Sequence, residues 1–277
     1  MIPFNFEYVQ PSTVQEAARL FHELALQGKQ PLYYSGGTEI ITMARINRLH
    51  TRAVIDIKNI PECHTLVSHN DKLVLGSALT LSQIHDSEAF PLLGEVAAGV
   101  ADRTSRNKIT LGGNICSAFM YREAVLPLLL TDSEVRIAGP GGLKQVPIHE
   151  VFHGTLQLEK GEFLIQLTTE SSYIRMPYVT FKKRKVAAID YPLVTIAAIQ
   201  THSGIRAAFS GVCAFPFRSP VIEEILNRRL TPLELRIEEA IAYLSAPILD
   251  DIKGSAAYRG FVLKSTLLQT MLTLGGA

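Results

Sequence analysis

The first 57 residues alternate between apolar segments of helical and extended character. An apolar stripe with helical spacing follows Thr13, and Thr13 and Glu16 fit a capping box, in which each side chain binds a free backbone N–H at the helix start. Short apolar runs at 32–34 and 54–57 are typical of buried strands. The pattern therefore predicts a small α/β unit over residues 1–57.

The middle of the chain is predicted to contain two hairpins and several helices. Residues 65–79 hold two apolar runs separated by the polar turn His69-Asn70-Asp71, and residues 135–147 form a similar pair around Gly139-Pro140-Gly141-Gly142. Helical spacing occurs in three segments of this region, at 81–85, 92–102 and 124–130.

The pattern changes after residue 170. Three extended runs predict a meander of antiparallel strands, at 178–183, 194–200 and 205–209. Thr231-Pro232-Leu233-Glu234 predicts a helix start, with Thr231 as the cap and proline at the first helical position. The stretch 261–274 predicts an amphipathic C-terminal helix. We expect a domain boundary near 171–176.

Composition narrows the class of protein. The 277 residues are 47% hydrophobic and 19% charged, which suits about two globular domains. The net charge of +1 gives no indication of nucleic-acid or membrane-surface binding. No run of about 18 apolar residues predicts a membrane helix, and the N-terminus lacks the pattern of a signal peptide.

The cysteines and histidines predict neither a disulfide framework nor a metal site. Cys63, Cys116 and Cys213 are far apart and odd in number, which favours a reducing compartment, and we expect a cytoplasmic protein. Three cysteines cannot supply the four thiolates of an iron–sulfur cluster, so any cluster must belong to another chain. The histidines are interpreted as ordinary surface residues.

Two glycine-bearing loops are the strongest indication of chemistry. Ser35-Gly36-Gly37-Thr38 leaves an apolar strand, and consecutive amides in such a turn form a concave donor array for phosphate oxygens. Thr110-Leu111-Gly112-Gly113-Asn114 offers the same chemistry. One glycine pair alone is more often a tight turn, but a pyrophosphate needs donors from both sides. Neither G-x-G-x-x-G nor G-x-x-x-x-G-K-[ST] occurs at a helix start.

At these loops the sequence resembles the FAD-binding medium subunit of molybdenum hydroxylases of the xanthine dehydrogenase and carbon monoxide dehydrogenase type. The resemblance spans nearly the whole chain, and the second loop is its most specific match. The segments that carry it are Tyr8–Ser12, Ser35–Ile40, Val54–Ile57, Gly76–Thr80, Arg106–Asn114, Phe181–Asp190 and Tyr258-Arg259.

The resemblance implies which residues bind FAD. The pyrophosphate and ribityl chain would contact both loops, and Lys182 or Lys183 would lie near the flavin ring. The implied set is Ser35, Gly36, Gly37, Thr38, Glu39, Ile40, Thr80, Thr110, Gly112, Gly113, Asn114, Ser117, Glu123 and Lys182. No residue would act as an acid, base or nucleophile, because the flavin carries the redox chemistry.

One segment departs from the family pattern. After Gly112-Gly113-Asn114 the family carries S-P-x-x-D, whereas this chain has Phe119-Met120-Tyr121-Arg122-Glu123. Glu123 keeps the carboxylate, but the serine and proline are missing, which puts the usual FAD contact at this point in question.

Two other segments also fit a purely structural role. The run Lys182–Lys185 also fits a solvated strand edge. Tyr33-Tyr34 also fit core aromatics.

The resemblance further implies an α+β fold. A vanillyl-alcohol-oxidase-type (PCMH-type) FAD-binding domain of two α/β subdomains, about 1–57 and 58–172, would precede a C-terminal domain at 173–277 with a three-stranded antiparallel sheet and helices. The implied partners are a molybdopterin-binding large subunit, a 2Fe–2S small subunit, and NAD or another electron acceptor. No nucleic acid or membrane is expected.

Three functions remain open at this point. The first is an electron-transfer subunit that passes electrons from the iron–sulfur clusters through FAD. The second is a non-enzymatic scaffold subunit with a degraded flavin site, suggested by the Phe119–Glu123 departure. The third is a free-standing flavin oxidase, for which the sequence has neither a covalent-flavin histidine nor an added substrate domain.

Overall fold

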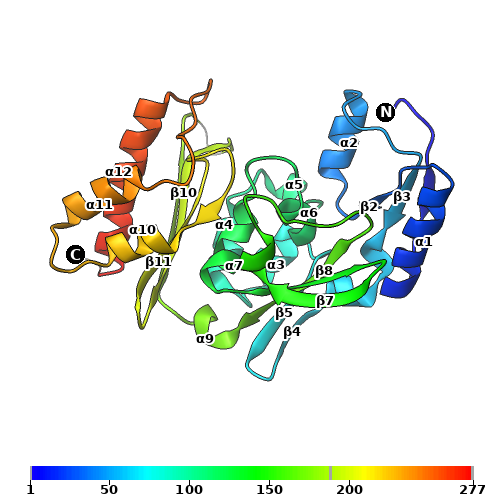
Figure 1. Ribbon diagram of the computed structural model, residues 1–277, viewed down its shortest axis with the longest axis horizontal. Coiled ribbons are helices and arrows are strands. Elements are labelled where there is room, and N and C mark those ends of the chain that lie inside the picture. The colour runs from blue at the N-terminus through cyan, green and yellow to red at the C-terminus, as the bar shows by residue number, and fades with distance from the viewer. Residues whose placement is uncertain (1, 187–188, 276–277) are drawn as a thin grey trace.

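A computed structural model describes residues 2–186 and 189–275, in which three sheets follow one another along the chain (Figure 1). The first sheet is parallel, with the order β1–β3–β2. Every residue of its central strand is buried. The elements of this unit are β1 (Glu7–Val9), α1 (Val14–Leu26), β2 (Leu32–Tyr34), α2 (Thr38–Arg45) and β3 (Ala53–Asp56).

The predicted stripe of α1 is confirmed, but the capping box differs from the prediction. The Thr13 hydroxyl accepts from the Glu16 amide at 3.1 Å, as expected. The Glu16 carboxylate, however, accepts from the Ser12 amide at 2.8 Å instead of from Thr13. Tyr33 is a core aromatic, since its ring stacks on Phe21 with centroids 5.1 Å apart.

The second sheet is antiparallel, with the order β4–β5–β8–β6–β7, and both predicted hairpins are confirmed. The predicted helix over 92–102 was too long. It ends at Ala98, and Asp102 instead caps a separate short helix. The elements are β4 (Leu66–His69), β5 (Lys72–Gly76), α3 (Leu81–Ser87), α4 (Pro91–Ala98), α5 (Arg103–Arg106), α6 (Leu111–Ile115), α7 (Leu126–Leu130), β6 (Glu134–Gly139), β7 (Gly142–Pro147), α8 (Ile148–Val151) and β8 (Phe163–Glu170).

The C-terminal sheet has the order β12–β11–β10–β9 and confirms the predicted meander. It also contains a fourth strand of two residues, which is too short to produce an alternating pattern. Residues 171–174 form the short helix α9 (Ser171–Ile174) at the predicted boundary. The remaining elements are β9 (Tyr178–Arg184), β10 (Pro192–Thr201), β11 (Gly204–Ser210), β12 (Phe217–Arg218), α10 (Pro220–Leu226), α11 (Leu233–Ala242) and α12 (Ala256–Thr273).

The starts of the last two helices differ from the prediction. Helix α11 begins one residue later than expected, so that Pro232 occupies the cap position and no side chain caps the helix. Helix α12 begins five residues before the predicted stripe, where the Ser255 hydroxyl accepts from the Tyr258 amide at 3.2 Å. Capping by a serine outside the apolar stripe explains the earlier start.

Strand β10 is buried on both faces and joins the two domains. Ile196 and Ala198 pack in the C-terminal core, whereas Ala197 and Ile199 pack in the core of the second subdomain. Alternate side chains of a strand point to opposite faces, so a single strand serves both cores. The C-terminal sheet is therefore held between its own helices and the preceding domain.

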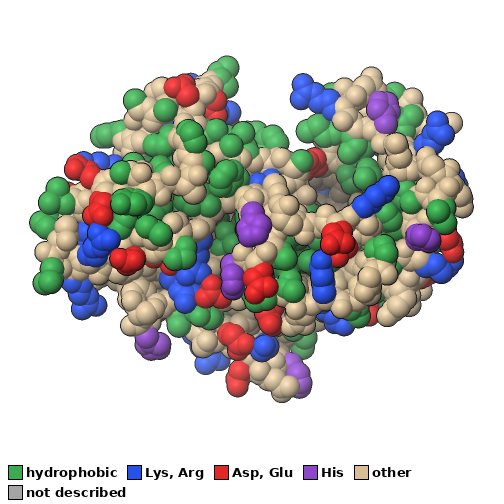
Figure 2. Space-filling view, viewed as in Figure 1, with side chains coloured by type: hydrophobic (Ala, Val, Ile, Leu, Met, Phe, Trp, Pro, Cys, Tyr) green, Lys and Arg blue, Asp and Glu red, His purple; other side chains and the backbone are tan. Residues whose placement is uncertain are grey.

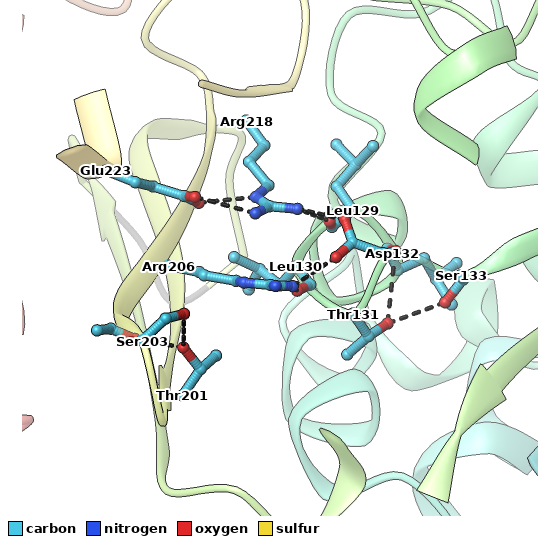
Figure 3. Close-up of polar contacts among 12 residues, drawn as sticks. Leu129, Leu130, Thr131, Asp132, Ser133, Thr201, Ser203, Arg206, Arg218 and Glu223 are labelled. Atoms are coloured by element: carbon cyan, nitrogen blue, oxygen red, sulfur yellow. Dashed lines mark hydrogen bonds and ion pairs between the residues drawn. The ribbon is translucent and has the colours of Figure 1, made fainter. Parts of the chain in front are cut away.

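Two arginines of the C-terminal sheet brace this interface (Figure 3). Arg206 donates to the Leu130 carbonyl at 2.8 Å and forms an ion pair with Asp132 at 2.6 Å. Arg218 forms ion pairs with Asp132 at 2.5 Å and with Glu223 at 2.7 Å. Asp132 has a positive φ of 48°, which turns the chain after α7 toward both guanidinium groups.

Candidate functional site

The first glycine loop leads directly into the N-terminus of α2. Gly37 occupies the cap position with φ 68°, and no side chain caps the helix. The first helical hydrogen bond runs from the Ile41 amide to the Gly37 carbonyl at 2.9 Å. The amides of Thr38, Glu39 and Ile40 precede that bond and have no acceptor within the helix. Free amides at a helix start, together with the positive end of its dipole, favour a phosphate.

Both glycines of this loop are required by close packing. A Cβ atom at Gly36 would collide with the Lys108 carbonyl, and a Cβ atom at Gly37 would collide with the ring of Tyr34. The positive φ of Gly37 adds a backbone reason for glycine. The contact between Gly36 and Lys108 brings the first loop against the segment that leads into the second.

A buried carboxylate supports the first loop from behind. Asp56 is 1% exposed, forms an ion pair with Lys58 at 2.6 Å and accepts a hydrogen bond from the Tyr8 hydroxyl. The Lys58 ammonium also donates to the Ser35 carbonyl at 3.0 Å and lies 4.6 Å from the centre of the Tyr34 ring. Sequence reasoning missed this support, because nothing in the local pattern links Tyr8 to Asp56.

The second loop differs from the predicted donor array. The Gly112 amide donates to the Ser77 carbonyl at 2.8 Å, and the Gly113 amide donates to the Thr110 hydroxyl at 3.2 Å. The Leu111 and Asn114 amides are also bonded to backbone carbonyls. The loop forms the short helix α6 with Thr110 as its cap, so its amides are already satisfied and it serves as a wall beside the first loop.

Gly112 is required by the packing of that wall. A Cβ atom there would lie 2.6 Å from the Ser77 Cβ atom. Thr80 pairs with Thr110 in an isolated bridge, but its hydroxyl accepts from the Gln83 amide at 3.2 Å within a complete capping box of α3. Thr80 therefore lies next to the start of the wall and stabilises the start of α3.

Glu39 links α2 to the segment after α6. Its carboxylate accepts a hydrogen bond from the Ser117 hydroxyl and another from the Ala118 amide at 3.2 Å. Arg122, which is 2% exposed, donates to the Ser117 carbonyl at 2.8 Å. Burial lowers the pKa of Arg122, and the nearby Glu39 carboxylate raises it. These contacts place Ser117, which the resemblance implies as an FAD contact, beside the N-terminus of α2.

Glu123 and Lys182 form a separate buried pair. The Glu123 side chain is 3% exposed and forms an ion pair with Lys182, and it also accepts from the Thr195 hydroxyl at 2.5 Å. Lys182 donates to the Gly99 carbonyl at 2.8 Å, and burial lowers its pKa. Glu123 is thus directed toward the C-terminal domain, and its carboxylate oxygens already have partners.

Lys182 and Lys183 lie on opposite faces of β9. Lys182 reaches the carbonyl that follows α4, whereas Lys183 donates to Gln269 of α12 at 3.2 Å. Of the two lysines that the resemblance offered, only Lys182 faces the FAD-binding domain. Alternation of side chains along a strand decides this choice.

Three aromatic side chains gather near Lys253, whose ammonium lies 5.7 Å from the centre of the Tyr191 ring. Tyr121 and Tyr191 stack with centroids 4.8 Å apart, and Phe119 lies 5.1 Å from Tyr191. Asp190 forms an ion pair with Lys253 at 2.5 Å, and this pair lowers the pKa of Asp190. The segment that departs from the family pattern therefore contributes an aromatic surface in place of serine and proline.

The predicted residues thus form two groups. Ser35 to Ile40 lie together with Ser117 and the wall from Thr110 to Asn114, whereas Glu123 and Lys182 are paired at the junction with the C-terminal domain. Figure 2 shows a hollow in the surface between α2 and the α5–α6 region. The hydroxyl of Ser35 is buried and has no hydrogen-bond partner among the described residues. An unpartnered donor and three free amides fit the phosphate groups of a dinucleotide.

His149 and His153 have the H-E-x-x-H spacing, which sequence reasoning overlooked. Both side chains are exposed, and α8 ends at Val151 with an extended backbone at Phe152 (φ −110°, ψ 100°). The two histidines therefore do not share one helical face. Within residues 2–186 and 189–275, no group of three or more His, Cys, Asp or Glu side chains is arranged to hold a metal ion.

Comparison with known families agrees with this geometry. The family described as the FAD binding domain in molybdopterin dehydrogenase matches residues 4–168. The chain belongs to this family. As a member it is an FAD-binding component of an oxidoreductase, and its cofactor is FAD.

Several curated relatives match this family member over almost its full length. The carbon monoxide dehydrogenase medium chain of Hydrogenophaga pseudoflava is 25% identical, over 94% of this chain and 93% of the relative. The xanthine dehydrogenase FAD-binding subunit of Escherichia coli O157:H7 is 28% identical, over 97% of this chain and 94% of the relative.

Solved structures show the same fold. A carbon monoxide dehydrogenase structure from Hydrogenophaga pseudoflava matches with a TM-score of 0.87 at 24% identity, covering 98% of each chain. Quinoline 2-oxidoreductase from Pseudomonas putida 86 matches with a TM-score of 0.85 at 20% identity, covering 99% of this chain and 98% of the other. The predicted α+β fold of this flavoprotein is confirmed. In its described part, no helix is long and apolar enough to cross a membrane.

Proposed function

We propose that this chain is the electron-transfer subunit of a xanthine dehydrogenase-like molybdenum hydroxylase. It receives electrons from iron–sulfur clusters on a 2Fe–2S small subunit, after substrate oxidation on a molybdopterin-binding large subunit, and passes them to NAD or another acceptor. The names of the relatives, a medium chain and an FAD-binding subunit, support an assembly of several chains. FAD supplies the redox chemistry when bound, while the protein binds and orients it.

The observation that carries the proposal is the uncapped N-terminus of α2 beside the unpartnered Ser35 hydroxyl. The Thr38, Glu39 and Ile40 amides and Ser35 bind the pyrophosphate, with Gly112 and Gly113 as the wall opposite. Glu39 and Ser117 hold this wall and α2 together. Lys58, which is held by Asp56, binds the Ser35 carbonyl and keeps this acceptor away from the anion. The loop therefore presents hydrogen-bond donors to the phosphate.

The Glu123–Lys182 pair acts at the other end of the site. Lys182 lies at the junction of the domains, where its ammonium would attract an anionic reduced flavin and the paired Glu123 carboxylate offsets part of that attraction. Three free cysteines, Cys63, Cys116 and Cys213, support an assembly in a reducing compartment such as the cytoplasm.

The test is a visible spectrum of the purified chain, taken before and after FAD is added and excess FAD is removed. We expect flavin absorbance to be retained by the wild-type chain and lost in Gly37→Val. Gly141→Val is the matched control, because a Cβ atom at Gly141 meets nothing within 4 Å. A circular dichroism melt establishes that each variant is folded.

The outcomes separate the remaining functions. A folded wild-type chain that retains no flavin would favour the scaffold subunit with a degraded site. Bleaching of the flavin by an organic substrate added to this chain alone would favour a free-standing oxidase. Flavin that is reduced only when the partner subunits and their substrate are present is the result that the proposal requires.

A further inference from the structure

A polar cavity lies in the C-terminal domain. The elements that line it, β10, β11, α11 and the end of α12, are remote from α2 (Figure 1). The cavity has a volume of about 200 Å³ and opens between the β10–β11 turn, the segment after α10 and the end of α12. Its polar lining includes Arg229, Arg236, Asn227 and Gln200, and it contains no acidic side chain. We infer that this cavity binds a small oxyanion, a phosphate or carboxylate group held by Arg229 and Arg236.

Arg236 is the central observation. It is 3% exposed, and its Nη1 atom donates to the Leu226 carbonyl at the end of α10, at 2.7 Å. Its Nε atom is buried, and none of the residues that the structure describes forms a hydrogen bond with it. In the described part of the chain, Arg236 forms no ion pair. A buried cation is costly unless it is paired, so an anion in the adjacent cavity would supply the missing partner.

The acidic residues of the neighbouring helices are paired with other cations. Glu223 pairs with Arg218 at 2.7 Å. Glu224 and Glu239 pair with Arg228 at 3.3 and 2.7 Å. Arg229 is exposed and forms no ion pair within the described residues. Within residues 2–186 and 189–275, two guanidinium groups therefore line the cavity without a carboxylate to neutralise them.

The shape of the cavity limits the ligand. Its volume is below the roughly 300–1,000 Å³ of sites that bind drug-sized molecules, but it is ample for one oxyanion. The planar guanidinium group matches carboxylate and phosphate oxygens in pairs. One wall is rigid, because the Asn227 side chain accepts from the Ile205 amide and donates to the Ile205 carbonyl, both at 2.8 Å.

The test is calorimetric titration of the wild-type chain with inorganic phosphate, and separately with acetate, at constant ionic strength. We expect saturable binding of at least one anion that weakens about tenfold or more in Arg229→Ala. Arg228→Ala is the matched control, since Arg228 is the adjacent exposed arginine but pairs with Glu224 and Glu239. Arg236→Gln should also abolish binding. If this change at a buried residue prevents folding, the titration of Arg229→Ala still decides the test.

The results of the anion titration can be distinguished from the results of the FAD-binding test. Saturation by phosphate identifies a phosphate ligand, and saturation by acetate alone identifies a carboxylate. Phosphate can also bind at α2, so the titration is repeated on Gly37→Val, which should keep the anion site. Arg229→Ala should retain its FAD. Absence of saturable binding by either anion, or unchanged binding in Arg229→Ala, would overturn the inference whatever the FAD result.

Discussion

The Ser35 hydroxyl is the most direct test of the flavin site at the scale of one residue. It is buried without a partner, so removing it should leave the stability of the free protein nearly unchanged. A hydrogen bond to a charged phosphate contributes roughly 1.5–3 kcal/mol, so Ser35→Ala should weaken FAD binding about tenfold or more. Fluorescence titration of FAD measures the change.

Ser210→Ala is the control for that prediction. The Ser210 hydroxyl is also buried and unpartnered, but it lies in β11 of the C-terminal domain. Its removal should not change FAD binding. Equal affinity of FAD for Ser35→Ala and Ser210→Ala would exclude Ser35 from the site.

Tyr8 gives the structure a dependence on alkaline pH. Its hydrogen bond to the Asp56 carboxylate is the main reason that its pKa is raised from 10.0 to about 12, with burial as a smaller cause. A raised pKa in the folded state means that the stabilisation is complete below pH 10 and is lost as pH rises toward 12. We therefore expect the melting temperature of Tyr8→Phe to fall less steeply than that of the wild type over this interval. Parallel curves for the two proteins would contradict the assigned hydrogen bond.

At the scale of the element, the starts of the helices determine which loops can bind a ligand. Thr110 caps α6 and Thr80 caps α3 with their own side chains, whereas α2 starts at a glycine that offers no cap. All three starts carry a hydroxyl residue near a turn in the sequence. Of these three described starts, that of α2 is the one without a side-chain cap, which leaves its amides free for a phosphate.

Thr80→Ala tests this division. Loss of an N-cap hydroxyl costs about 1 kcal/mol of stability, which should appear in urea denaturation as a lower midpoint with an unchanged slope. If Thr80 acts only as a cap of α3, the FAD affinity of the variant stays at the wild-type value. A tenfold loss of affinity with little change in stability would instead support the direct flavin contact that the family resemblance implies.

At the scale of the whole molecule, the brace at Asp132 holds the C-terminal domain against the FAD-binding domain. Asp132 is 38% exposed, and both arginine partners are largely buried. The contribution of these ion pairs to stability should therefore lie between that of exposed pairs and that of buried pairs. We expect Asp132→Asn to lower the free energy of unfolding by roughly 1–2 kcal/mol, and differential scanning calorimetry would record a lower melting temperature. Asparagine tolerates the positive φ at this position, so the backbone turn is retained.

Asp86→Asn provides the comparison for the brace. The Asp86–Arg103 pair is also an aspartate–arginine pair, at 2.8 Å, but its side chains are 48% and 63% exposed. Its loss should change stability by less than about 0.5 kcal/mol. Equal effects of the two substitutions would show that Asp132 is only a surface charge.

The sequence by itself determined the features that depend on local geometry. Hairpins such as 65–79 follow from period-two alternation, and α1 follows from a 3.6-residue stripe and the Thr13 cap, because backbone geometry imposes these spacings on neighbouring residues. The glycine at 37 was recognisable for the same reason, because its positive φ disfavours other residues. Gly36 and Gly112 are instead required by close contacts with Lys108 and Ser77, which lie far from them in the sequence.

Only the tertiary structure decided which side chains meet across the chain. Glu123 and Lys182 are 59 residues apart, and Glu123 and Thr195 are 72 apart, so no local spacing could reveal that the carboxylate is already paired. The same holds for the brace at Asp132 and for the amides of the second loop, which bond to the strand end at Ser77. Such partners depend on the path of the chain through space, and a pattern of apolar positions constrains that path only one element at a time.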